Sequence, residues 1–121
     1  MSKIISLPTF SDSRGSLTII EQFSEFEIKR IYYIYDVDGS RGGHRHKKTT
    51  QGLICLSGRC QVYINNGESE KIVELDSPEK CLILEPEDWH TMDNFTESSV
   101  LLVLASEYYD REDYIDEPYD N

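Results

Sequence analysis

The feature that most constrains the fold is a succession of short, β-prone segments, each closed by a turn signal. Segments rich in β-branched and aromatic residues recur along the 121 residues, and Gly, Asn, Asp and Ser cluster between them. The expected strands are 4–7, 17–22, 28–37, 49–56, 60–65, 71–75, 81–84, 91–95 and 100–105. Eight or more short strands with regularly spaced turns predict an all-β sandwich or barrel.

The turn signals set the expected connections between these strands. Ser57-Gly58 lies between 49–56 and 60–65, so these two strands are expected to form a hairpin. Asn65-Asn66-Gly67 marks another turn, and residues 38–43 are interpreted as a glycine-rich loop. A single short helix is expected near 110–115. The chain contains no internal repeat or linker, so residues 1–121 are predicted to form one domain.

Composition narrows the class of protein. Hydrophobic residues make up 38% of the chain, which is typical of a globular domain, and no run of eighteen apolar residues predicts a membrane span. The first residues, MSKIISLPTF, do not resemble a signal peptide, so we expect a cytoplasmic protein. The cysteines are odd in number and form no CxxC pair. Cys55 and Cys60 are expected to face each other across the hairpin as reduced, buried thiols.

The charge is uneven along the chain. The net charge of −11 argues against nucleic acid or an anionic membrane as partner. Residues 39–67, however, contain no acid and five basic side chains, while residues 110–121 carry six acids and one Arg. The basic window is interpreted either as a local anion site or as a solvated strand balanced by acidic neighbours.

Two of the three histidines lie in the basic window, in the stretch RGGHRHKKTTQG. His44 and His46 are one residue apart, so on a strand both side chains would project from the same face. Such a pair could bind a metal, assist a phosphate clamp, transfer protons or simply occupy a basic turn.

The spacing of further polar residues resembles the cupin family. HxH is followed after four residues by Gln51 and then by Gly58, and the later segment PEDWHTMDN places His90 four residues before Asn94. In metal-binding cupins the corresponding ligands would be His44, His46, Gln51 and His90. Gln51 stands where a glutamate is usual, and a neutral amide is a poor substitute for a carboxylate ligand. Neighbouring basic residues also oppose a cation, so no metal or other cofactor is expected.

A narrower resemblance covers most of the chain. The segments DSRGSL, KRIYYIYD, RGGHRHKKTTQ, DSPEKCLILEPEDWH and VLASEYYDREDYI together resemble the sugar-nucleotide 3,4-ketoisomerases, in the same order. This resemblance implies a cupin-type jelly-roll barrel, a homodimer with exchanged N-terminal strands, and no metal. It also implies that the ketone of dTDP-4-keto-6-deoxyglucose moves from C4 to C3, in the biosynthesis of 3-amino or 3-acylamino deoxysugars.

The resemblance assigns the proton-transfer roles. His46 is expected to be the base that removes the C3 proton, and His44 its partner at the sugar oxygens. Tyr33 is a candidate hydrogen-bond donor to those oxygens, with core packing as its alternative role.

The resemblance also assigns the binding roles. Arg14 and Arg41 are expected to bind the diphosphate with Lys48, and Gln51 and His90 to line the substrate pocket. Arg14 could instead brace its turn, and His90 could be a core histidine. The competing functions are a metal-dependent cupin of the dioxygenase type and a non-catalytic sugar-nucleotide-binding cupin.

Overall fold

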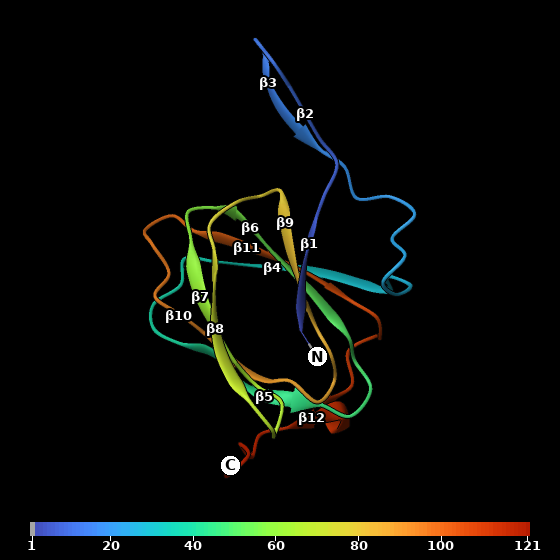
Figure 1. Cartoon of the computed structure of the whole chain (residues 1–121), viewed down its shortest axis with the longest axis vertical. Coiled ribbons are helices and arrows are strands. Elements are labelled where there is room, and N and C mark those ends of the chain that lie inside the picture. The colour runs from blue at the N-terminus through green and yellow to red at the C-terminus, as the bar shows by residue number, and fades with distance from the viewer. Residues whose placement is uncertain (1) are drawn as a thin grey trace.

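The computed structural model describes residues 2–121 as two five-stranded antiparallel sheets that face each other, with a separate hairpin (Figure 1). The first sheet contains, in spatial order, β1 (Lys3–Ser6), β9 (Lys80–Leu84), β6 (Gln51–Ser57), β11 (Val100–Ala105) and β4 (Arg30–Tyr35). The second contains β12 (Tyr114–Ile115), β5 (Arg41–His46), β10 (Trp89–Asp93), β7 (Cys60–Asn65) and β8 (Glu70–Leu75). The hairpin pairs β2 (Thr9–Asp12) with β3 (Gly15–Thr18). Among residues 2–121 no strand pairing closes the two sheets into a continuous barrel.

The only helical element in residues 2–121 is a 3₁₀ turn, η1 (Arg111–Asp113). The prediction of an all-β fold with at most one short C-terminal helix is therefore confirmed. Within the same residues, no helix has the length and apolar character needed to cross a bilayer.

The core has two layers because the first sheet is buried on both faces. Leu53 and Leu101 point between the sheets and are fully buried there. Ile54 and Leu104, on the opposite face of the same two strands, point outward but are equally buried, since segment 19–28 packs over them. Full burial of one such side chain contributes about 1.5–3 kcal/mol to stability. A strand was expected at 17–22, but the observed strand ends at Thr18. The second half of the expected strand belongs to this packing segment instead.

The predicted hairpin between 49–56 and 60–65 is wrong. β6 and β7 belong to different sheets, and the chain crosses between them at Ser57-Gly58, where Gly58 has φ = +71°. Each strand carries a row of apolar side chains, and both rows are buried because the two strands face each other across the core. Cys55 and Cys60 consequently lie in the same core cluster as free, buried thiols. The turn at 65–67 does join a hairpin, because β7 pairs with β8.

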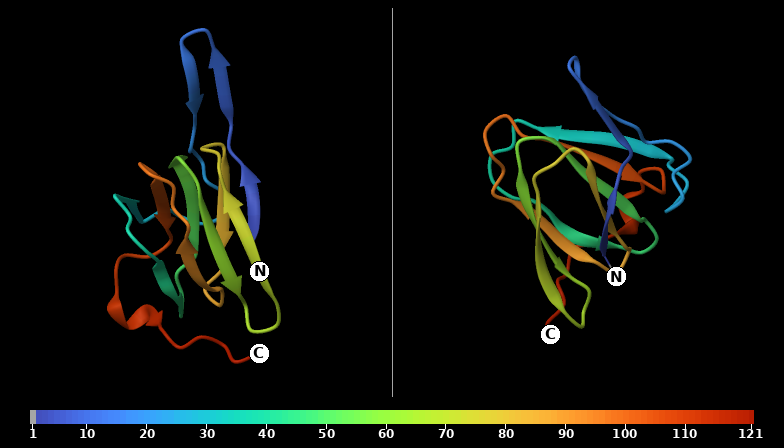
Figure 2. Two further views of the ribbon diagram at one scale, coloured as in Figure 1. Left: turned by 90° about the vertical axis from the view of Figure 1, so that its left-hand side faces the viewer. Right: turned by 45° about the horizontal axis from the view of Figure 1, so that its top comes forward.

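The N-terminal and C-terminal segments differ in how they contact the sandwich. The β2–β3 hairpin extends away from the sandwich (Figure 2), and its cross-strand pair Phe10 and Leu17 is 64% and 57% exposed. The acidic C-terminal segment, in contrast, runs along the opposite end of the sandwich and is fastened to it. The Trp89 indole Nε1 donates to the carbonyl of Asp116 at 3.0 Å, and β12 pairs with β5.

Candidate active site

A cavity of about 640 Å³ opens beside the C-terminal segment, which is a usual size for a small-molecule site. Strands of both sheets and the C-terminal segment contribute polar side chains to its wall. These side chains are Arg30, Tyr32, Arg41, His44, Gln51, His90, Tyr109, Arg111, Tyr114 and Asp116. The wall thus combines three guanidinium groups with imidazole, amide, phenol and carboxylate groups. Four residues predicted for the site lie here, namely Arg41, His44, Gln51 and His90.

Two glycines bring Arg41 to the same wall as His44. Alternation along a regular strand would send these side chains to opposite faces, because they are three residues apart. Gly42 and Gly43 have φ values of +84° and +85°, and the pairing register with β10 shifts at this point. This irregularity acts as a β-bulge and reverses the alternation. A side chain at Gly42 would come within 2.9 Å of the carbonyl oxygen of His90, so a glycine is needed there.

The three histidine rings lie close together, and two of them, His44 and His90, line the cavity. His44 and His90 face each other across the β5–β10 pair, with ring centroids 5.2 Å apart. The His44 and His46 rings are likewise 5.2 Å apart, which confirms that both side chains lie on one face. His46 is only 3% exposed and does not line the cavity. The rings of His44 and Tyr114 contact it, and both of these line the cavity.

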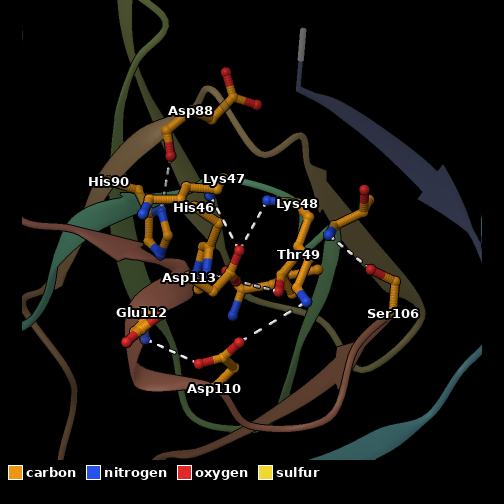
Figure 3. A network of polar contacts seen from close by, with 12 residues as sticks. His46, Lys47, Lys48, Thr49, Asp88, His90, Ser106, Asp110, Glu112 and Asp113 are labelled. Carbon is orange, nitrogen blue, oxygen red and sulfur yellow. Dashed lines mark hydrogen bonds and ion pairs between the residues drawn. The ribbon is translucent and has the colours of Figure 1, made fainter.

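Hydrogen bonds define the protonation of two of these rings (Figure 3). The Nδ1 atom of His46 lies 2.8 Å from Oδ2 of Asp113, and Nδ1 of His90 lies 3.0 Å from the main-chain oxygen of Asp88. An ionised carboxylate and a carbonyl only accept hydrogen bonds, so each Nδ1 carries the proton and donates it. Each Nε2 therefore presents a lone pair. Both Nε2 atoms are buried without a hydrogen-bond partner among residues 2–121.

Burial keeps the imidazoles neutral. Loss of hydration lowers the pKa of His44 to about 4 and that of His90 to about 3, with repulsion between the rings adding to the effect. Burial also lowers the pKa of His46, but the Asp113 carboxylate opposes this shift. At neutral pH the unprotonated nitrogens of the cluster can therefore accept hydrogen bonds, and the Asp113 carboxylate favours uptake of a proton by His46.

The donors around the histidines do not fit a metal site. Among residues 2–121 no group of three His, Cys, Asp or Glu side chains is placed so that it could hold a metal ion. Nδ1 of His46 is used by Asp113, and the amide nitrogen of Gln51 donates to the Tyr32 hydroxyl at 3.0 Å. Oε1 of Gln51 is buried and has no partner within the described chain. That oxygen is suited to accept a hydrogen bond from a ligand hydroxyl.

Three residues predicted for the site lie elsewhere in this chain. Tyr33 is 63% exposed on the outer face of β4, and its neighbour Tyr32 faces the cavity instead. Lys48 does not line the cavity, and its Nζ lies 3.9 Å from Oδ2 of Asp110. Arg14 lies at the turn of the projecting hairpin, where it pairs with Asp12 at 2.6 Å.

Several residues of the site, in the cavity wall or behind it, were not predicted. Arg30 and Tyr32 lie on one face of β4, and Ile31 and Tyr33 lie on the other. From residue type alone the second face resembles a core face, although it is exposed in the structure. Arg111 and Asp113 come from the acidic C-terminal segment, 65 or more residues from the histidine pair. The signal that could have found Asp113 is its place in DREDYI, one of the segments that carry the family resemblance.

The whole chain, residues 1–121, matches the family described as FdtA, WxcM-like, C-terminal. The chain belongs to this family. A curated relative from Aneurinibacillus thermoaerophilus, named TDP-4-oxo-6-deoxy-alpha-D-glucose-3,4-oxoisomerase, is 46% identical over 99% of this chain and 88% of its own length.

Solved structures of the same class share the fold. A variant of the 3,4-ketoisomerase QdtA from Thermoanaerobacterium thermosaccharolyticum, solved in complex with TDP-4-keto-6-deoxyglucose, is 45% identical, with a TM-score of 0.91 over 96% of this chain and 87% of the other. The WlaRB TDP-quinovose 3,4-ketoisomerase from Campylobacter jejuni is 42% identical, with a TM-score of 0.90 over 96% and 92%. The predicted family and its jelly-roll architecture are thereby confirmed.

Proposed function

We propose that this member of the family moves the ketone of dTDP-4-keto-6-deoxyglucose from C4 to C3 by histidine-mediated proton transfer. Its similarity to these relatives identifies it as a 3,4-ketoisomerase of a TDP-linked sugar. The proposal adds the substrate, the residues that act, and a place in the biosynthesis of 3-amino or 3-acylamino deoxysugars. A 3-keto product supplies the carbonyl that an amination at C3 would need.

The observation that carries the mechanism is the pair of unpartnered Nε2 lone pairs beside the cavity. The C4 carbonyl acidifies the C3 proton, and Nε2 of His46 removes it to form an enediolate. The imidazolium that results is stabilised by Asp113, and it returns the proton to C4. His44 moves the hydroxyl proton between the two oxygens. The rings of His44 and Tyr114 contact His46 and line the cavity, so they separate slightly to admit the sugar.

The remaining polar groups of the wall bind the substrate. Arg41, Arg30 and Arg111 provide guanidinium groups for the diphosphate, for which planar paired donors are well suited. Nε of Arg30 is buried without a partner in the described chain, as is Oε1 of Gln51. Sugar hydroxyls can satisfy Gln51 and Nε2 of His90. Tyr32 takes the donor role predicted for Tyr33.

Incubation with dTDP-4-keto-6-deoxyglucose tests this function directly. NMR of the product should show a ketone at C3 and will define the configuration at C4. In D₂O, deuterium should appear at C4, because the base exchanges its proton with solvent. A bound but unchanged sugar, without exchange at C3, would instead identify a non-catalytic binding protein. Turnover that disappears with a chelator and returns with a metal would identify the dioxygenase-type alternative or another metal-dependent cupin.

We also propose that the chain forms a homodimer in which N-terminal strands are exchanged. Strand β1 pairs with β9 of its own chain, so the segment available for exchange is the β2–β3 hairpin. An isolated two-stranded hairpin is marginally stable, and Phe10 and Leu17 are exposed on this one. Exchange would carry Arg14, at the turn of this hairpin, onto the partner subunit, and we propose that it joins the diphosphate site there. Light scattering should show a dimer, and deletion of residues 9–18 should yield a monomer.

A further inference from the structure

We infer that Asp113 is a positioning residue that holds the proton of His46 on Nδ1 and so keeps the Nε2 lone pair available as the base. The inference rests on the proposed role of His46. Asp113 itself does not line the cavity, so its effect on the substrate passes through the imidazole.

The hydrogen bonds around Asp113 hold an ionised carboxylate in one orientation. Oδ1 accepts the main-chain N–H groups of Lys47 at 3.1 Å and Lys48 at 2.8 Å. Oδ2 accepts the hydroxyl of Thr49 and the Nδ1–H of His46. The carboxylate is 67 residues from His46 in sequence yet receives four donors from a single short stretch, 46–49. Figure 3 shows it at the centre of this set of contacts.

These contacts also determine the charge of the carboxylate. Burial acts to raise the pKa of Asp113, but the hydrogen bonds from Thr49, His46 and Lys48 outweigh it and hold the pKa below its ordinary value. An ionised carboxylate has no proton to donate. It therefore accepts the Nδ1 proton of His46 and favours the imidazolium that forms when Nε2 takes up the C3 proton.

The peptide hydrogen bonds make Asp113→Asn a sharp test. The Lys48 N–H group donates to Oδ1 at 2.8 Å and needs that acceptor, whereas the Lys47 N–H group also donates to the main-chain oxygen of Asp113 at 2.8 Å. The amide oxygen of the variant must therefore occupy the position of Oδ1. Its NH₂ group then points at Nδ1 of His46. Two donors cannot face each other, so the imidazole proton should move to Nε2. The variant would keep the shape of the site but lose the base, as occurs when the aspartate of a catalytic His–Asp pair is replaced by its amide.

The experiment is ¹⁵N NMR of histidine-labelled enzyme together with steady-state kinetics. With three histidines in the chain, each ring can be assigned by single replacement. The wild type should carry its His46 proton on Nδ1, and Asp113→Asn should carry it on Nε2. The kcat of this variant should fall by about 10²–10⁴-fold, with KM changed by less than about threefold. Asp113→Glu, which retains a carboxylate, should keep the Nδ1 proton and recover part of the kcat.

Asp110→Ala is the matched control for loosening of the C-terminal segment. Asp110 caps the same 3₁₀ turn by accepting Glu112 N–H at 3.0 Å, but it does not contact His46. Its loss should lower stability while leaving the tautomer and kcat nearly unchanged.

Three results would overturn the inference. They are an unprotonated Nδ1 on His46 of the wild type, an unchanged tautomer in Asp113→Asn, and a shifted tautomer without loss of kcat. The first can be read from the wild type alone, so the test does not depend on the variant folding. If His46→Asn also turns over normally, the proposed role of His46 fails. If His46→Asn loses its activity as expected while Asp113→Asn stays active, only the role of Asp113 is refuted.

Discussion

The two sides of the histidine cluster use a buried aspartate in opposite ways. On the β5 side, the Asp113 carboxylate contacts His46 directly. On the β10 side, His90 uses only the main-chain oxygen of Asp88. The carboxylate of Asp88 points elsewhere and accepts the N–H of Glu85 at 2.8 Å, which closes the turn before β10.

This difference separates a histidine that can take up a proton from one that stays neutral. A carboxylate offsets the charge of an imidazolium, whereas a carbonyl offers only a dipole. Burial raises the pKa of Asp88, consistent with a carboxyl that has one oxygen without a partner in the described chain. Two histidines with the same tautomer and similar burial therefore have different chemical capacities. His46 is suited to be a base, and His90 to accept a hydrogen bond.

The largest expected contrast is between His46→Asn and His90→Asn. Loss of the base should lower kcat by about 10²–10⁴-fold. At position 90 the asparagine amide can still donate to the Asp88 carbonyl, and only the Nε2 acceptor is lost, so kcat/KM should fall by about tenfold, or ~1.4 kcal/mol. Kinetics on both purified variants measures this, with circular dichroism to confirm folding. A reversed order would mean that His90 is the base.

An intermediate effect is expected in the pH dependence of stability. His44 and His90 have pKa values of about 4 and about 3 in the folded protein, below the ordinary value of 6.5. Between these values and 6.5 the unfolded chain binds more protons, so the free energy of unfolding decreases as the pH falls through this window. Each group contributes a slope of up to about 1.4 kcal/mol per pH unit. Urea unfolding at pH 7 and pH 5 should show this loss.

His90→Asn provides the control for the pH prediction. Removing one neutral histidine should flatten the decrease in the free energy of unfolding between pH 7 and pH 5. If the wild type is equally stable at both values, the histidines are not held neutral, and the contrast between the two sides of the cluster disappears.

The smallest effect is expected for Asp88→Asn. The asparagine oxygen can still accept the Glu85 N–H, and the main-chain oxygen that binds His90 is unchanged. Activity should stay within about twofold and stability within about 1 kcal/mol of the wild type, since no paired charge is lost. Measured beside Asp113→Asn, this variant tests whether the aspartates differ as their contacts indicate. A large loss of kcat in Asp88→Asn would show that its carboxylate acts on His90.

Much of the site could be predicted from local sequence. Alternation along a strand placed His44 and His46 on one face, and the family segments led to Arg41, Gln51 and His90. The glycine pair in RGGHRH was interpreted as part of a loop, although its positive φ values are what brings Arg41 to the same wall. Alternation could not choose between Tyr32 and Tyr33, because both faces of β4 carry aliphatic and aromatic side chains.

The sequence by itself determined the class of fold, the family and the histidine pair, because these depend on residue type and on spacings within single strands. Tertiary structure alone decided which sheet each strand joins, since a strand buried on its inner face can satisfy its hydrogen bonds with different neighbours. Tertiary structure also decided the partner of each histidine. Asp113 and Asp88 are both acids near short turns, and only the path of the C-terminal segment across β5 brings one of them to Nδ1 of His46. Hydrogen bonds depend on atoms that meet in space, and 67 residues of intervening chain leave no local pattern from which that meeting could be predicted.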